Sequence, residues 1–342
     1  MTRATRQVGY GGPHVSALTL GSWHIYDRVP FERTVALLRA AHDEGVNAFD
    51  VGMYGSTLVR PGDEDVGSFT DIIFAHAMRV AGIGRDRYTL SIKAWVGSAP
   101  LADQVHRQLA RLGKPNADML ILGDIYQPLD LRALVAEIGE LIAQGRIGDW
   151  GVANWSASQL REAWRHAEQL GVAGPQTAHL RYNVFRRSVV EGDPMRSVLA
   201  EHGMTIQASD CLEGGVVAGR RDASRPVAYD HGSLRPAMLA AFPRYQAVAE
   251  SLGVSPAQLG LAFCLANPQV SGVVVGISTL EQLRDNLQAL NVLERVGREA
   301  LRDALSPFWI DRDVVDPEAS WGTRIDAVKP DYQAKGGSYR VE

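Results

Sequence analysis

The sequence has few cysteines, no long apolar run and little net charge, and each shortage excludes a class of protein. Its two cysteines, Cys211 and Cys264, are too few for a disulfide framework and too far apart in sequence for a metal-binding pair, so we expect two small buried apolar groups. No stretch has the length that a membrane-spanning helix needs. The net charge of −4 gives no reason to expect nucleic acid or a membrane as partner.

We expect no secretory signal at the N-terminus, because Arg3 and Arg6 are not followed by an apolar stretch. A reducing cytoplasm is therefore the expected location. Apolar residues make up 46% of the chain and charged residues 22%, as in an ordinary globular protein. We expect a small-molecule substrate as partner, and a monomer or a homo-oligomer. No linker rich in Pro, Gly or Ser divides the 342 residues, so we expect one domain over 1–342.

Strand-like and helix-like segments alternate along the chain. Short apolar runs predict strands at 15–20, 47–51, 88–94, 118–122, 147–152, 177–180, 204–208 and 271–275. Helical spacing predicts helices at 33–43, 69–80, 101–112, 131–144, 156–170, 188–201, 255–266 and 279–290. This order predicts an α/β fold, a parallel (β/α)8 TIM barrel. The alternative is an open doubly wound sheet, which the lack of an early G-x-G-x-x-G disfavours.

Both ends of the chain carry additions to this barrel. Glycines at 9, 11 and 12 predict an N-terminal β-hairpin over residues 6–16. Residues 307–342 contain Trp309, Trp321 and few helical stripes, and predict an extended C-terminal tail.

Three polar residues lie near the ends of two predicted strands. Asp50 ends one apolar run, Tyr54 follows four residues later, and Lys93 comes near the end of the next run. The carboxyl ends of barrel strands share one face, so these side chains can share a pocket. A lysine lowers the pKa of a neighbouring tyrosine and makes it a proton donor, and the acid holds the lysine. A solvated lysine and a turn tyrosine are the structural alternatives.

A second set of residues predicts a nucleotide site. The Gly-Ile-Ser-Thr turn at 276–279 opens a helix, whose free N–H groups and positive dipole end suit a phosphate. Ser278, Gln282 and Asn286 lie on one helical face, with Arg284 nearby. A capped surface helix explains the same pattern without a ligand. The acids at 63–65 lack an ordered ligand spacing, so we expect no metal site.

Taken together, the chain resembles the aldo-keto reductases, especially the branch that includes the potassium-channel β-subunits. The resemblance is carried by S-A-L-T-L-G-S-W at 16–23, N-A-F-D-V-G-M-Y-G at 47–55, Q-G-R-I-G-D-W-G-V-A-N at 144–154, Y-N-V-F-R-R at 182–187 and G-I-S-T-L-E-Q-L-R-D-N-L-Q-A-L at 276–290. It implies that the hairpin covers the barrel floor and that the tail folds over the active-site mouth. It also implies NADPH as the cofactor, with NADH less favoured.

The resemblance also implies a role for individual residues. The implied catalytic residues are Tyr54, Lys93 and Asp50. The implied cofactor-binding residues are Trp23, Asn154, His179, Ser209, Leu212, Gly214, Arg220, Gly276, Ser278, Gln282 and Asn286.

The active site departs from the family pattern in several places. The family usually has a histidine after the fourth strand, where this chain has Gly123 or, counted back from Pro128, Tyr126. The Asp50–Tyr54 spacing is one residue shorter than usual. Around the nicotinamide, Ala153 replaces a serine, His179 a glutamine and Ser209 an aromatic ring, and Ser278 replaces an arginine near the 2′-phosphate.

These departures leave several functions open. We expect NADPH-dependent reduction of a small carbonyl, with a substitute donor such as His24, Tyr26, Asp124 or Tyr126, or reduction of an activated C=C bond. One alternative is a cofactor-binding redox sensor or partner subunit with little turnover. Another is a non-redox lyase or isomerase on the same barrel.

Overall fold

Eight parallel strands form a closed barrel in the computed structural model, which describes residues 5–23, 25–54, 68–97, 99–125, 128–221 and 234–318. Around the barrel the strands follow the order β10-β3-β4-β5-β6-β7-β8-β9. They are β3 (Leu18–Gly21), β4 (Ala48–Val51), β5 (Thr89–Ala94), β6 (Ala117–Leu122), β7 (Ile147–Ala153), β8 (Thr177–Arg181), β9 (Thr205–Ser209) and β10 (Val270–Val275). The predicted TIM barrel is confirmed.

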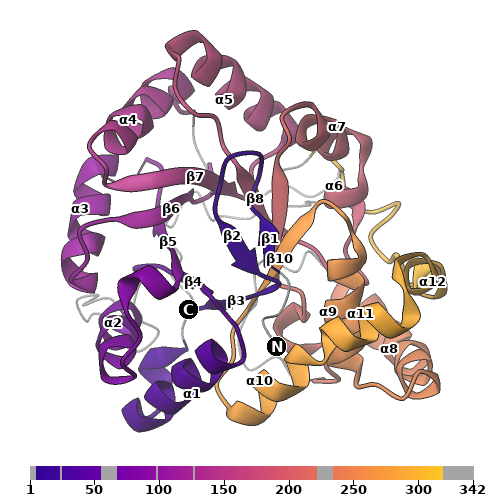
Figure 1. Ribbon diagram of the computed structural model, residues 1–342. Coiled ribbons are helices and arrows are strands. Elements are labelled where there is room, and N and C mark those ends of the chain that lie inside the picture. Colours follow the sequence, from indigo (N-terminus) through magenta and orange to yellow (C-terminus); the bar gives the residue numbers. More distant parts are fainter. Residues whose placement is uncertain are drawn as a thin grey trace, which may run out of the picture.

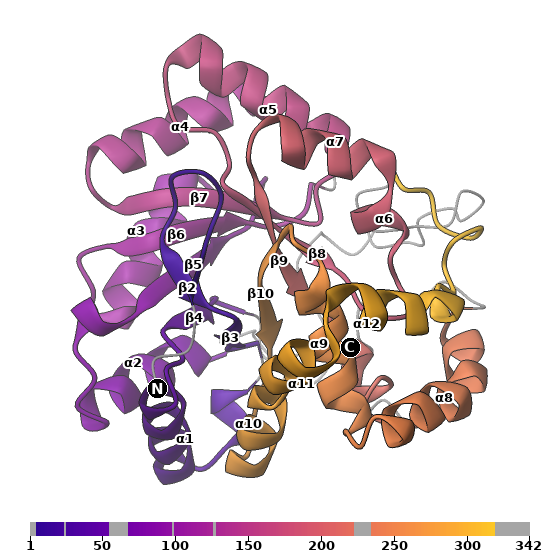
Figure 2. The ribbon, with the colours of Figure 1, turned by 45° about the vertical axis from the view of Figure 1, so that its right-hand side comes forward.

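The helices surround the barrel as an outer ring (Figure 1). They are α1 (Phe31–Asp43), α2 (Thr70–Val80), α3 (Leu101–Leu112), α4 (Leu131–Ala143), α5 (Ala157–Leu170), α6 (Ser188–Glu191), α7 (Asp193–Glu201), α8 (Leu234–Ser251), α9 (Pro256–Ala266), α10 (Leu280–Leu287), α11 (Ala289–Val296) and α12 (Arg298–Ala304). Figure 2 shows α8, α11 and α12 around α9 on one side of the barrel. Capping boxes at Ser156 and Ser255 fix where α5 and α9 begin.

The element boundaries differ from the sequence prediction where glycine or proline intervenes. The helix predicted at 188–201 is two helices, because Gly192 is extended and Pro194 lies in the first turn of α7. Local patterns predict no helix at the position of α8, which carries Pro243 in its interior. The predicted strand at 15–20 is split between β2 (His14–Ser16) and β3.

The predicted N-terminal hairpin is present and lies at the amino ends of the barrel strands. Strand β1 (Thr5–Gln7) pairs antiparallel with β2. In the connecting turn, the Gly9 N–H donates to Thr205 Oγ1 at 2.9 Å and the Gly11 N–H donates to Gln176 Oε1 at 3.0 Å. Val8 is fully buried and packs with apolar side chains of the barrel interior. The hairpin therefore closes the barrel floor, and leaves the opposite face for a ligand.

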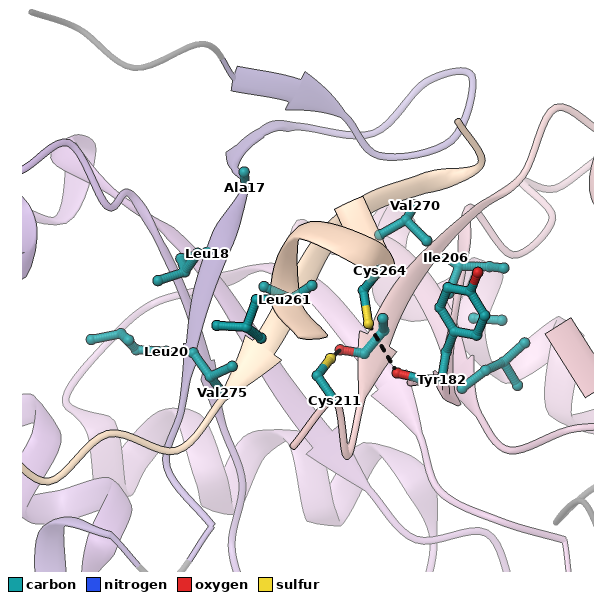
Figure 3. Close-up of a cluster of buried hydrophobic side chains, with 14 of the residues drawn as sticks. Ala17, Leu18, Leu20, Tyr182, Ile206, Cys211, Leu261, Cys264, Val270 and Val275 are labelled. Carbon is teal, nitrogen blue, oxygen red and sulfur yellow. Dashed lines mark hydrogen bonds between the residues drawn. The ribbon is translucent and has the colours of Figure 1, made fainter. Parts of the chain in front are cut away.

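The two cysteines are buried side by side between the barrel and α9 (Figure 3). Cys211 Sγ–H donates to the Ala208 carbonyl at 3.0 Å, and Cys264 Sγ–H donates to the Tyr182 carbonyl at 3.2 Å. The prediction that both are small buried apolar groups is confirmed, although folding brings them together.

The C-terminal segment is tied to the loop after β8 as far as it is described. A short 3₁₀ turn, η4 (Ser306–Phe308), is followed by Asp311, whose carboxylate accepts hydrogen bonds from the N–H groups of Arg187 and Ser188. This part of the predicted tail is thus folded rather than extended. Residues 319–342, with Trp321, lie outside the described residues.

Over the described ranges, no single helix combines the length and apolarity needed to cross a membrane. The pair α8 and α9 meets that criterion by length and composition, but it is bent by 87°, and α9 is buried in the fold.

Candidate active site

A cavity of about 530 Å³ opens at the carboxyl ends of the barrel strands. Its size is in the range of small-molecule and cofactor sites. It is lined by every residue that the sequence predicts for catalysis or cofactor binding: Trp23, Asp50, Tyr54, Lys93, Asn154, His179, Ser209, Leu212, Gly214, Arg220, Gly276, Ser278, Gln282 and Asn286. The shared location follows from the topology, because all eight strands deliver their last residues to this face.

Asp50, Lys93 and Tyr54 form one buried group. Lys93 Nζ lies 3.0 Å from Asp50 Oδ2, and the Tyr54 hydroxyl is hydrogen-bonded to the Lys93 side chain. Burial opposes the charge on Lys93, but Asp50 and Tyr54 outweigh it and raise the lysine's pKa above its usual value. Lys93 therefore stays a cation that holds the phenol oxygen.

The pKa of Tyr54 corrects one prediction. We expected Lys93 to lower it, but burial raises it to about 12, and Asp50 adds to this effect. The cation of Lys93 and a hydrogen bond to Ser22 only partly compensate. Tyr54 is therefore protonated at neutral pH, as a proton donor must be, but its acidity is not enhanced in this state of the protein.

Two glutamines of α3 hold the ends of the catalytic strands. Gln108 is fully buried; its Nε2 donates to the Val51 carbonyl at 2.7 Å, and its Oε1 accepts from the Lys93 N–H at 3.3 Å. One turn earlier, Gln104 accepts from the Trp95 N–H at 2.8 Å and donates to its carbonyl at 2.9 Å. The role of these glutamines was not predicted, although their i, i+4 spacing on an apolar helix face was a usable signal.

His179 lies deep in the cavity as a neutral imidazole. Burial lowers its pKa to about 4. Its Nε2 is 2.5 Å from Gln207 Oε1, so Nε2 carries the proton and Nδ1 is an acceptor. The structure gives Nδ1 no hydrogen-bond partner. A buried acceptor without a partner costs free energy, and a ligand amide in the cavity would satisfy it.

Backbone strain is concentrated along one wall of the cavity. Among the described residues, the non-glycine positions with positive φ are Asn154, Asp210 and Glu213, at 57°, 48° and 47°. The first two line the cavity. Such conformations cost about 1–3 kcal/mol each and cluster at functional sites.

The loop after β9 is held by a buried ionic network. Glu213 accepts from Arg186 Nε at 2.9 Å and from Asn183 Nδ2 at 2.8 Å, and Arg181 lies 3.1 Å from Asp210. Burial would raise the pKa of Glu213, but the two arginines lower it to about 2. The network fixes Gly214 and Gly215, whose φ values of 64° and 100° bring the backbone to the cavity edge.

The far end of the cavity lies at the start of α10. Ser278 donates to Gln282 Oε1 from its N–H at 3.0 Å and from its hydroxyl at 3.1 Å. Asp285 also lines this end and is held by Gln258 at 2.6 Å. Arg284 is exposed and does not line the cavity.

Trp95 occupies the space beside Gly123. A Cβ at Gly123 would lie 2.3 Å from Trp95 Cε3, closer than real contacts allow. The indole Nε1 donates to the Met53 carbonyl at 3.3 Å, and the ring lies 6.2 Å from the Tyr54 ring. An aromatic ring therefore fills the space that a side chain at Gly123 would need, and no sequence pattern pointed to Trp95.

The residues expected as substitute hydrogen-bond donors differ in whether they line the cavity. Asp124 is buried in the cavity, where its charge helps to raise the pKa of Lys93. Tyr26 is wrong as a substitute, because its ring is buried against Phe74 and does not line the cavity. His24 and Tyr126 lie outside the described residues. Among the described residues, no group of three or more His, Cys, Asp or Glu could hold a metal ion.

Comparison with known proteins agrees with the barrel fold. Residues 17–296 match the Aldo/keto reductase family, so the chain belongs to that family. Over 319 residues it is 26% identical to a probable voltage-gated potassium channel subunit beta from Arabidopsis thaliana, covering 84% of this chain and 91% of the relative. A rice protein of the same name is 27% identical over 327 residues, covering 86% and 94%.

Proposed function

We propose that the protein is an NADPH-dependent oxidoreductase that reduces a small carbonyl or an activated C=C bond. The observation that carries this proposal is the buried Asp50–Lys93–Tyr54 group inside a cavity that continues to the glycine loop and to α10. Family membership supports an oxidoreductase in general.

The chain's own residues supply proton handling. Tyr54 holds a proton at its hydroxyl, and Lys93 faces that oxygen with a positive charge that stabilises the phenolate left after proton transfer. Asp50 keeps Lys93 in place through the 3.0 Å contact. Met119 and Ile121, on the neighbouring strand β6, are fully buried in an apolar cluster with Val8 of the N-terminal hairpin.

The residues of the cavity fit a nicotinamide dinucleotide, which would supply the hydride. Nδ1 of His179 and the strained Asn154 would hold the carboxamide, since both present polar groups to the cavity. Arg220 and the positive-φ glycines 214 and 215 suit a pyrophosphate. Ser278, Gln282 and Asn286 would contact the adenosine end.

The competing function is a cofactor-binding sensor or partner subunit with little turnover. The names of the relatives, channel subunits beta, favour it, and so does Trp95 in place of a polarising donor. A non-redox lyase or isomerase would require no dinucleotide. For any of these functions, we propose that the protein is located in the reducing cytoplasm, which suits its two free buried thiols.

Cofactor titration separates these functions. We expect NADPH to bind with a dissociation constant in the micromolar range or below, and to be oxidised when an aldehyde, quinone or enone is added. Tight NADPH binding without consumption of any substrate in the panel would favour the sensor. If neither NADPH nor NADH binds, the non-redox enzyme is favoured and the proposal is refuted.

Replacing Lys93 by methionine tests the proposed proton donor, and the structure shows that this test needs a second variant. Lys93→Met leaves the buried Asp50 carboxylate without its cation, a change that costs about 3–5 kcal/mol in folding stability. The double variant Lys93→Met/Asp50→Asn removes both charges and is the matched control. Both variants should lose most reductase activity, and unchanged turnover in the stable one would disprove the assignment.

A further inference from the structure

The short spacing between Asp50 and Tyr54 raises a geometric problem. When the tyrosine is one residue closer to the strand, its Cα has a different position, but its hydroxyl must still reach Lys93. The structure shows the hydroxyl there, hydrogen-bonded to the Lys93 side chain. Some feature of the turn 51–54 must therefore redirect the ring.

Gly52 is that feature, because the Tyr54 ring folds back over it. A Cβ at Gly52 would lie 2.5 Å from Tyr54 Cζ, 2.6 Å from the hydroxyl oxygen and 2.9 Å from Cε2. The far end of the ring thus occupies the volume that any side chain at position 52 would take. Gly52 is not among the glycines with positive φ, so this volume, rather than backbone strain, is what requires glycine.

Ser22 joins the same two residues. Its hydroxyl accepts a hydrogen bond from the Gly52 N–H at 3.2 Å and is hydrogen-bonded to the Tyr54 hydroxyl, whose pKa it helps to lower. Ser22 is fully buried, and its own N–H donates to the Asp50 carbonyl at 2.9 Å. Thr70 Oγ1 holds the Ser22 carbonyl at 2.8 Å. The serine is thus fixed against both ends of the turn.

We propose that Gly52 and Ser22 are positioning residues of the reduction: together they seat the Tyr54 ring so that a four-residue spacing delivers the hydroxyl to Lys93. The inference rests on the proposed reductase function, but its geometric part stands independently. Gly52 supplies the space over which the ring lies, and Ser22 fixes the hydroxyl at the end of it.

The principal test is Gly52→Ala. An added methyl group must push the end of the phenol ring outward by roughly 1 Å, and a misplacement of this size costs about 10²-fold in rate. We expect kcat to fall about a hundredfold with KM changed little, because the cofactor and substrate contacts remain. The thermal midpoint should shift by less than about 4 °C, since the displaced group is the free end of a side chain.

Two further variants separate positioning from general damage. Gly139→Ala is the matched control: its Cβ would lie 2.6 Å from a side-chain atom of Val172, on α4 and away from the cavity. It should affect stability only. Ser22→Ala should lower kcat, and Ser22→Thr, which keeps the hydroxyl, should recover it.

The decisive comparison is made in a Tyr54→Phe background. If Gly52 acts through the Tyr54 hydroxyl, Gly52→Ala should cause no further loss of residual activity there. An equal loss in both backgrounds, or an unchanged kcat in the single variant, would overturn the inference. A crystal structure of Gly52→Ala tests the geometry without turnover. A longer Tyr54–Lys93 distance supports the inference even if the parent proves inactive, which would refute only the proposed function, and an unchanged distance overturns it.

Discussion

Introducing a histidine at Gly123 should not create a fast aldehyde reductase, and the structure explains why. The Cβ of any residue at this position would meet Trp95 Cε3 at 2.3 Å and Cζ3 at 2.7 Å. The indole cannot easily give way, because Gln104 holds both backbone groups of Trp95 and the ring N–H is bonded to Met53. Gly123 is also fixed, since Trp155 Nε1 donates to its carbonyl at 2.9 Å.

The magnitude follows from two separate effects. Forcing an imidazole into this contact is overpacking, which typically costs about 1–3 kcal/mol of folding stability. Under the proposed function, the lack of a polarising donor should cost about 10²–10³-fold in carbonyl reduction, and a misplaced imidazole would not replace that donor. Gly123→His should therefore be less stable than the parent and equally slow with simple aldehydes.

The assay is urea unfolding together with steady-state NADPH oxidation, on the parent, Gly123→His, Trp95→Ala and the double variant. Because removing the indole makes room for the imidazole, we expect the double variant to be more stable than the sum of the single effects, by at least about 1 kcal/mol. Any gain in aldehyde reduction should be confined to the double variant.

Two results would refute this reasoning. If the parent reduces simple aldehydes at ordinary enzyme rates, about 1–10³ per second, no donor is missing. If Gly123→His alone is stable and fast, the indole is not the obstacle that the geometry indicates.

Three further predictions concern the cofactor, pH and the buried network. NADPH should bind more tightly than NADH by less than about tenfold in a fluorescence titration, because Ser278 is bonded to its own helix and Arg284 lies outside the cavity; equal affinities would mean that no 2′-phosphate site exists. Burial lowers the pKa of His179 from 6.5 to about 4, so the unfolded state takes up the proton first as the pH falls. The free energy of unfolding should therefore fall by about 3 kcal/mol between pH 6.5 and pH 4. Urea titrations at each pH measure this slope, and His179→Gln should flatten it. Glu213→Gln should lower the free energy of unfolding by about 3–5 kcal/mol and weaken NADPH binding. The control Asp193→Asn, in an exposed ion pair, should do neither. If the two variants lose equal stability in calorimetry, the role of the network is contradicted.

Much of the fold could be predicted from local patterns. Strand β7 and helix α5 follow from an apolar run and a serine cap, both of which are local in sequence. Helix α8 could not be predicted in this way, because Pro243 lies inside it and packing on α9 sustains it.

The candidate site shows the same division. The positions of Asp50 and Lys93 at strand ends predict that both face one cavity, because barrel topology places these ends on the same face. The placement of the Tyr54 ring over Gly52 and of the Trp95 ring beside Gly123 depends on side-chain volumes meeting between loops, which no periodicity records. For the same reason, burial reversed the expected direction of the Tyr54 pKa.

The closure of the barrel between β3 and β10 has a consequence for synthesis. The guanidinium of Arg6 donates to the Val270 carbonyl at 2.7 Å across 264 residues of sequence, and the first barrel strand pairs with the last. On a ribosome, the first strand is made long before its second neighbour exists, so it must wait with one unpaired edge. Contacts this distant in sequence close late and slowly, and an exposed edge meanwhile can pair with other chains. We therefore expect the yield of native protein to depend on chaperones and on the speed of translation through the codons for β10.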